Sequence, residues 1–234
     1  MIEIRRRSAS GSKRKGQGGA AAIQVAYDKD CTLCPRLAGF LAETHARYPD
    51  YWSRPVAPFG DARAEILIVG LAPGMHGANR TGRPFTGDHA GILLYETLHE
   101  LGLGTRAVSV SADDPLKLRN ARISNAVKCL PPQNKPLPDE IRRCNGYLRV
   151  ELEQSKKQVR VIVALGRIAH EAVLMALDLK RADFPFAHAA EHRLDATRQL
   201  VDSYHCSRYN TQTRRLTAPM FKSVLRRACQ LAER

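Results

Sequence analysis

The sequence predicts an α/β fold built around a central sheet of four mostly parallel strands. Four short apolar segments, rich in β-branched residues, have the length and composition of strands buried on both faces. Helix-like stretches separate them, and this alternation is typical of a doubly wound sheet. The expected strands cover residues 65–69, 122–127, 159–165 and 199–204.

The helices are expected before, between and after these strands. The first covers residues 31–48, where a Cys–Pro turn precedes Leu37, Phe40 and Leu41 on one face. A loop containing Pro and Trp then leads to Gly60 and the first strand. The other expected helices cover about 90–101, 138–156, 167–178 and 218–233.

The chain length and composition fit one domain over residues 27–234. The chain has 234 residues, of which 44% are hydrophobic, enough for a single core. No apolar run approaches the roughly 20 residues that span a membrane, and the first residues lack the apolar centre of a secretory signal. We therefore expect a cytoplasmic protein without a membrane partner, and a monomer.

The charge points to a polyanionic partner. The formal net charge is +14, and residues 1–20 hold six basic side chains and one acidic one. The remaining residues are also basic, so the excess is not confined to the terminus. We expect residues 1–26 to form a disordered basic tail and the body to bind nucleic acid. Charge alone does not separate DNA from RNA or an acidic membrane.

Four of the six cysteines have a spacing that suits metal ligation. Cys31 and Cys34 form a C-x-x-C pair, while Cys129 and Cys144 flank a Pro-rich loop. Four thiolates can hold zinc or an iron–sulfur cluster, and a zinc ribbon would normally pair two C-x-x-C knuckles. Four buried, unligated cysteines are the structural alternative. Disulfides are not expected in a cytosolic protein.

The loop after the first expected strand is rich in glycine. It begins Gly70-Leu71-Ala72-Pro73-Gly74 and lacks the patterns of a Walker loop or a dinucleotide fingerprint. Such a backbone can approach a flat ring closely, with Phe85 as a stacking face. Phe85 could instead belong to the core, and Asp88 is interpreted as the N-cap of the next helix.

Two more polar residues stand at expected strand ends. Asn125 closes the second strand, and an amide there can bond both an acceptor and a donor on a base edge. His205 follows the last strand and leads into a basic loop with Ser207 and Arg208. Because ligands bind outside the carboxyl ends of parallel strands, both are site candidates. A turn-capping Asn and a structural His are the alternatives.

Together these blocks resemble the family 5 (B-type) uracil-DNA glycosylases of the uracil-DNA glycosylase superfamily. The likeness covers about residues 27–232. The blocks that carry it are Cys31-x-x-Cys34-Pro35, Gly70-Leu71-Ala72-Pro73-Gly74, Asn79-Arg80-Thr81-Gly82-Arg83-Pro84-Phe85-Thr86-Gly87, Asn125-Ala126-Val127-Lys128-Cys129 and Cys144.

The resemblance implies a three-layer α/β/α fold and a [4Fe–4S] cluster on Cys31, Cys34, Cys129 and Cys144. It also implies DNA repair by excision of uracil or other deaminated bases such as hypoxanthine, leaving an abasic site. Gly70 to Gly74 would surround the flipped base.

Individual residues also acquire roles from this resemblance. Phe85 would stack on the base, Asn125 would recognise the uracil edge, and His205 would donate to uracil O2. Asn79 corresponds to a polar position that helps to hold water. The residues expected to contact DNA are Arg80, Arg83, Ser207, Arg208 and Arg214.

The sequence departs from the family pattern in one place and lacks an acid in another. Cys206 stands where the last motif commonly has Pro, and Leu71-Ala72 occupies the place where many relatives have a water-activating carboxylate. We therefore expect donors to the leaving uracil, His205 and Asn125, to supply much of the catalysis. Flipping is cheapest at a mismatch, which favours U·G over U·A.

Two other functions fit parts of the sequence. A non-catalytic nucleic-acid-binding protein with a four-cysteine metal site would explain the charge. A zinc deaminase acting on nucleobases would need an H-x-E and P-C-x-x-C signature, whereas this chain has C-x-x-C-P.

Overall fold

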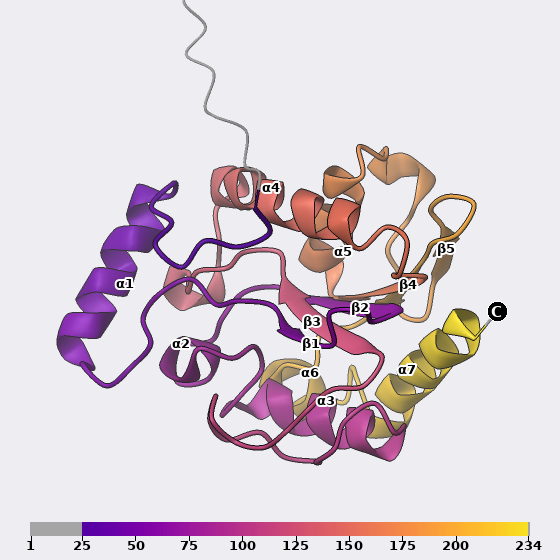
Figure 1. The fold of residues 1–234 in the computed structure, drawn as a ribbon, viewed down its shortest axis with the longest axis horizontal. Coiled ribbons are helices and arrows are strands. Elements are labelled where there is room, and N and C mark those ends of the chain that lie inside the picture. Colours follow the sequence, from indigo (N-terminus) through magenta and orange to yellow (C-terminus); the bar gives the residue numbers. More distant parts are fainter. Residues whose placement is uncertain (1–24, 234) are drawn as a thin grey trace, which may run out of the picture.

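The computed structural model describes residues 25–233, and a six-stranded sheet lies at its centre (Figure 1). The strand order is β1-β3-β2-β4-β6-β5. The expected tail, residues 1–26, lies almost wholly outside the described residues. The strands are β1 (Phe59–Gly60), β2 (Ile66–Gly70), β3 (Ala121–Asn125), β4 (Val161–Leu165), β5 (Glu191–Arg193) and β6 (Gln199–Ser203).

The four expected strands form the parallel centre of the sheet. They are β3, β2, β4 and β6, each within two residues of its expected bounds, and neighbours in this order pair in parallel. No pattern in the sequence predicted β1 and β5, which pair antiparallel at the two edges of the sheet. These edge strands have only two and three residues, too few for any periodic pattern.

Helices cover both faces of this sheet, which confirms the expected fold class. In Figure 1, α4 and α5 lie on one side, and α3 and α7 lie on the other. The larger helices are α1 (Pro35–Arg47), α3 (His89–Glu100), α4 (Pro138–Gln154), α5 (Arg167–Ala176) and α7 (Ala218–Ala232). The shorter ones are α2 (Ala78–Thr81), α6 (Arg208–Gln212) and two 3-10 turns, Pro132–Asn134 and Arg181–Asp183.

Alternation along each strand builds two cores. In β2, Ile66 and Ile68 face α3 and α7, while Leu67 and Val69 face α4 and α5. All four side chains are at most 1% exposed. Burying a side chain of this size stabilises the fold by about 1.5–3 kcal/mol, so both helical layers are held firmly.

A third core attaches α1 to the domain. Leu37 and Leu41 of α1 pack against Val127, Leu130 and the cysteines that follow β3. No helix in the described part of the chain is both long and apolar enough to cross a membrane.

The parallel arrangement gathers the ends of four strands at one edge. Gly70 at the end of β2 pairs with Asn125 at the end of β3. On the other side, Leu165 at the end of β4 pairs with Ser203 at the end of β6. The loops that follow these residues therefore meet in space, although they are far apart in the sequence.

Candidate active site

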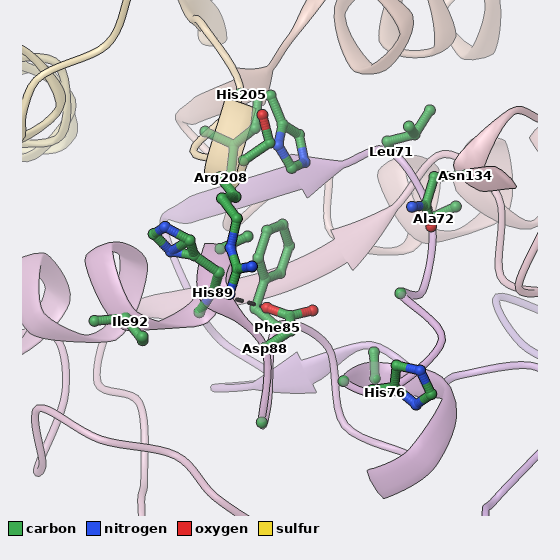
Figure 2. A pocket seen from close by; sticks show the side chains of 18 of the residues that line it. Leu71, Ala72, His76, Phe85, Asp88, His89, Ile92, Asn134, His205 and Arg208 are labelled. Carbon is green, nitrogen blue, oxygen red and sulfur yellow. Dashed lines mark hydrogen bonds between the residues drawn. The ribbon is translucent and has the colours of Figure 1, made fainter. Parts of the chain in front are cut away.

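A cavity of about 1160 Å³ opens where the strand ends meet (Figure 2). Phe85, Asn125 and His205 all line it, as do Leu71 and Ala72 of the glycine-rich loop. In Figure 2, Phe85 and His205 lie near the centre of the view. Leu71, Ala72 and Asn134 lie to the right of them. Most of the expected ligand-binding side chains therefore meet in one space.

Gly70 allows Asn125 and Phe85 to approach the end of β2. A Cβ atom at position 70 would lie 2.5 Å from Asn125 Oδ1 and 2.6 Å from Phe85 Cζ. Both distances are shorter than van der Waals contact, so any side chain here would displace one partner. Phe85 itself has φ 54°, a strained value for a bulky residue, and is only 6% exposed. The glycine and the strained aromatic residue thus shape the same cavity wall.

Asn125 presents an unused acceptor at this wall. The residue is 2% exposed, and its Oδ1 atom has no hydrogen-bond partner among the described residues. A buried polar atom without a partner destabilises a protein by about 1–3 kcal/mol. Such an atom beside a cavity is expected to bond a ligand when one is present.

His205 approaches the same space from the end of β6. Its ring stacks on Phe85, with centroids 5.9 Å apart and an angle of 27° between the planes. Asn210 Nδ2 donates to the carbonyl oxygen of His205 at 2.8 Å and fixes the backbone there. Burial lowers the pKa of His205 from 6.5 to about 4, so the ring is neutral at physiological pH. A neutral imidazole can donate one N–H bond into the cavity.

The residues of the first loop divide between the cavity and the interior. Leu71, Ala72 and Gly74 line the cavity, whereas Gly70 and Pro73 are buried behind it. Asn79 is fully buried in α2 and does not line the cavity, and neither of its amide side-chain atoms has a partner in the described chain. The structure therefore places the Asn79 side chain outside the cavity lining.

Asp88 is the N-cap of α3, as expected, and it also lines the cavity. Its Oδ1 accepts from the Gly91 N–H at 2.9 Å. It also packs so closely against the first loop that a Cβ atom on Gly77 would lie 2.3 Å from its Oδ2. Burial raises the pKa of Asp88, while the N-cap hydrogen bonds act against this shift.

One of the residues expected to contact DNA is turned inward. Arg83 is 6% exposed, donates to Asp114 Oδ1 at 2.5 Å and lies over the Phe59 ring. Burial would raise the pKa of Asp114, but hydrogen bonds from Arg83 and from backbone N–H groups lower it to about 2. This ion pair commits Arg83 to the fold, so the expectation that Arg83 contacts DNA does not fit the structure.

The other residues of that set differ in position. Ser207 and Arg208 line the cavity, and the Ser207 hydroxyl also caps α6 by accepting from the Asn210 N–H at 3.4 Å. Arg80 and Arg214 are exposed but lie outside the cavity lining.

Sequence reasoning missed several parts of the wall. Gly166, Arg167 and Ile168 follow β4 directly, and the rule that ligands bind at strand ends could have identified them. Residues 107–110 also line the cavity, but no motif marks that segment. Asn134 lies in the Pro-rich loop after Cys129 and has φ 56°, which the sequence does not reveal.

The four cysteines singled out in the sequence surround one small apolar pocket. Cys31, Cys34, Cys129 and Cys144 all line it, with Leu37 and Tyr147. Burial is the main cause that raises the pKa of Cys129, and the neighbouring thiols Cys144, Cys31 and Cys34 raise it further. The backbone N–H of Lys128 donates to Cys144 Sγ at 3.2 Å.

Polar contacts fix the segment of Cys31 and Cys34 against α4. Arg36 donates to both carboxylate oxygens of Glu140, at 2.7 and 2.6 Å. Arg143 Nη1 donates to the carbonyl oxygen of Leu33 at 2.9 Å. Cysteines 95 or more residues apart in the sequence are therefore held close together, as ligands of one prosthetic group would have to be.

The chain is similar to known proteins along most of its length. The model of the uracil DNA glycosylase superfamily matches residues 57–229. A type-5 uracil-DNA glycosylase of Thermus thermophilus is 50% identical over 207 residues, which cover 86% of this chain and 94% of that protein. The type-5 enzyme of Pyrobaculum aerophilum is 42% identical, over 85% of this chain and 88% of its own.

A more distant likeness extends to a neighbouring type. The type-4 uracil-DNA glycosylase of Archaeoglobus fulgidus is 37% identical over 122 residues, which cover 52% of this chain and 53% of that protein. The type-5 relatives match at higher identity and over much more of the chain. The chain therefore belongs to the uracil-DNA glycosylase superfamily and, within it, to the type-5 family.

Proposed function

We propose that this protein is a DNA-repair glycosylase that hydrolyses the N-glycosidic bond of uracil in DNA and leaves an abasic site. The observation that carries the proposal is the cavity wall formed by Phe85, Asn125 and His205, with Gly70 directly behind Phe85 and Asn125. It offers a ring to stack on, an amide oxygen without a partner in the described chain and a neutral N–H donor. These groups are complementary to a flipped pyrimidine.

The chemistry requires charge stabilisation at both ends of the breaking bond. As the glycosidic bond lengthens, electrons move into the uracil ring and positive charge develops on the sugar. An N–H donor aimed at the departing uracil stabilises its negative charge, and one such donor is worth about 3–4 kcal/mol. His205 and Asn125 are the proposed donors, with N–H groups of the Gly70–Gly74 loop beside them.

A water molecule must then add to the sugar. Positions 71 and 72 hold Leu and Ala, so neither supplies a carboxylate that could activate this water. Asn79 remains the proposed water-holding residue, acting from behind the loop, because its buried amide has no partner in the described chain. Asp88 and Glu96 are carboxylates that line the cavity. Asp88 is committed to its N-cap, so we do not assign it the role of base.

We propose that the cavity also admits bases other than uracil. A volume of about 1160 Å³ exceeds the need of one pyrimidine, which supports hypoxanthine and other deaminated bases as further substrates. The proposed DNA contacts are Arg80, Ser207, Arg208 and Arg214, since all four are at least partly exposed. We also propose an intracellular location and action as a monomer.

We propose further that the four cysteines hold a [4Fe–4S] cluster. No three of their Sγ atoms all lie within 4.8 Å of one another. A zinc ion bound at about 2.3 Å to each sulfur would need sulfurs about 3.8 Å apart. The wider spacing and the apolar lining suit a cluster better, and its role would be to tie α1 to the core.

The test is incubation of purified protein with duplexes that carry one uracil or one hypoxanthine, followed by strand cleavage at abasic sites. Duplexes with U·G, U·A and T·A pairs measure the base and mismatch preference. We expect abasic sites at uracil, most rapidly at U·G, and none at T·A. Tight DNA binding without abasic sites in any duplex would favour the non-catalytic binding protein instead.

A further inference from the structure

A buried cluster of His170, Asp202 and His192 lies away from the cavity, and none of the three lines it. His170 comes from α5, Asp202 from β6 and His192 from β5. Their side chains are 2%, 0% and 11% exposed, in that order. We call these three residues the His–Asp–His cluster.

The three side chains converge on the Asp202 carboxylate. His170 Nδ1 lies 2.8 Å from Asp202 Oδ1, and His192 Nε2 lies 3.2 Å from Asp202 Oδ2. The second nitrogen of His170, Nε2, lies 2.9 Å from the carbonyl oxygen of Phe184. One ligand atom from each residue can be chosen so that all three lie within 4.8 Å of one another.

A neutral His170 ring has one N–H group, whereas its two nitrogens both lie close to acceptor oxygens. The Phe184 carbonyl and a carboxylate oxygen of Asp202 both accept, so a His170 ring with a single N–H can donate to only one of them. The other ring nitrogen then turns a lone pair toward an acceptor oxygen, at 2.8 Å for Nδ1 and Asp202 Oδ1 or at 2.9 Å for Nε2 and the Phe184 carbonyl oxygen. Two lone pairs at this distance repel each other unless a cation lies between or beside them. That cation is either an additional proton or a metal ion.

We propose that the His–Asp–His cluster binds a divalent transition-metal ion, with Zn²⁺ as the ion of choice. Two imidazoles and a carboxylate form a donor set that suits zinc. A metal-bound imidazole commonly donates its other N–H to a backbone carbonyl, as His170 Nε2 does to Phe184. The positive charge of the ion removes the repulsion between the His170 lone pair and the neighbouring acceptor oxygen.

The position of the cluster indicates a structural role. The ion connects α5, β5 and β6, and Asp202 stands three residues before His205. Gly166, which precedes α5, lines the cavity. Rings of Phe184 and Phe186 pack edge-on against the two histidines. The bound metal therefore fixes two elements that lead into the active site, rather than meeting the substrate.

Metal counting on the holoprotein tests the proposal. Wild type, His192→Phe, Asp202→Asn and the control His45→Phe are dialysed against one Zn²⁺ buffer, and zinc and iron are then measured per chain. His45 is exposed on α1, far from the cluster in sequence. Zinc at the four cysteines contributes equally to all four proteins, so the differences report the cluster alone.

We expect wild type and His45→Phe to hold one zinc ion more per chain than His192→Phe and Asp202→Asn. Zinc should also raise the unfolding temperature of the first pair only, since an ion that binds the folded state stabilises it. Equal zinc counts in all four proteins would overturn the proposal and leave a proton as the cation.

X-ray absorption on wild type covers the case in which both cluster variants fail to fold. The proposal then requires nitrogen and oxygen scatterers at about 2.0–2.1 Å from zinc. A zinc spectrum with sulfur neighbours alone, or no retained zinc, would overturn it.

Discussion

The rings of Phe85 and His205 stack with centroids 5.9 Å apart and planes inclined by 27°. One comes from a loop that follows β2 and the other from the segment after β6, so the contact joins two strand ends across the sheet. Because both rings line the cavity, a flipped base that stacks on Phe85 would lie within reach of the imidazole.

Replacing Phe85 tests that stacking. Phe85→Ala should lose both substrate affinity and rate, because base–aromatic stacking is worth about 1–3 kcal/mol, or roughly 5- to 150-fold. Single-turnover cleavage of a U·G duplex over a range of enzyme concentrations separates the two effects. Phe85→Tyr is the matched control, since it keeps the ring. Near-normal kinetics in a folded Phe85→Ala protein would assign the ring to the core alone.

The proposed donors should matter more than the nearby carboxylate. His205→Ala or Asn125→Ala should lose about 10²-fold or more in rate, the scale of one lost donor. Asp88→Asn should keep most activity, because the Asn side chain can still cap α3. All three are compared at saturating enzyme after their folding is verified. An inactive Asp88→Asn beside an active His205→Ala would reveal a carboxylate base.

Gly70 offers a steric test of the same wall. Gly70→Ala should lower the cleavage rate by at least the effect of one displaced donor, about 10²-fold, because its Cβ would overlap Asn125 Oδ1 and Phe85 Cζ. Gly39→Ala is the control, since a Cβ atom there meets nothing within 4 Å. Circular dichroism and unfolding temperature accompany the rates. A folded Gly70→Ala protein with wild-type rates would show that Asn125 and Phe85 need not meet at this point.

The pKa of His205 leads to an expectation for pH dependence. Burial lowers this pKa from 6.5 to about 4, so the neutral, donating ring persists until the pH falls toward the lower value. The folded state therefore loses stability as the pH falls below 6.5, where the unfolded chain takes up the proton first. Single-turnover rates should show no decline near pH 6.5, and His205→Gln provides the comparison. A wild-type decline centred near 6.5 that His205→Gln lacks would contradict the shifted pKa.

The cysteine pocket gives a prediction with a visible signal. Cys34→Ser or Cys129→Ser should give colourless, poorly folded protein, because each thiolate of the proposed cluster would join the N-terminal segment to the core. Iron and sulfide analysis under anaerobic conditions is the measurement. Cys229→Ser, in α7 and outside the pocket, should remain as brown as wild type. Wild-type iron content in both pocket variants would refute the cluster.

Local patterns were enough to determine the central framework of this protein. The β-branched runs around Ile66 and Val161 predicted buried parallel strands, because burial on both faces leaves a continuous apolar segment. Asp88 was recognised as an N-cap, since that interaction spans only three residues. The rule that ligands bind at strand ends then predicted Asn125 and His205 as site residues, and both line the same cavity.

Only the tertiary structure decided contacts that depend on long-range packing. The inward turn of Arg83 depends on Asp114, 31 residues later, and the sequence gives no sign of that ion pair. The meeting of His170 with Asp202 likewise requires α5 to cover the face of the sheet on which Leu200 of β6 is buried. The short edge strands and the cavity-lining segment 107–110 have no periodic pattern of apolar residues that would reveal them in the sequence. Periodicity reports which face of an element is buried, whereas the identity of the partner on that face is set by how distant elements pack.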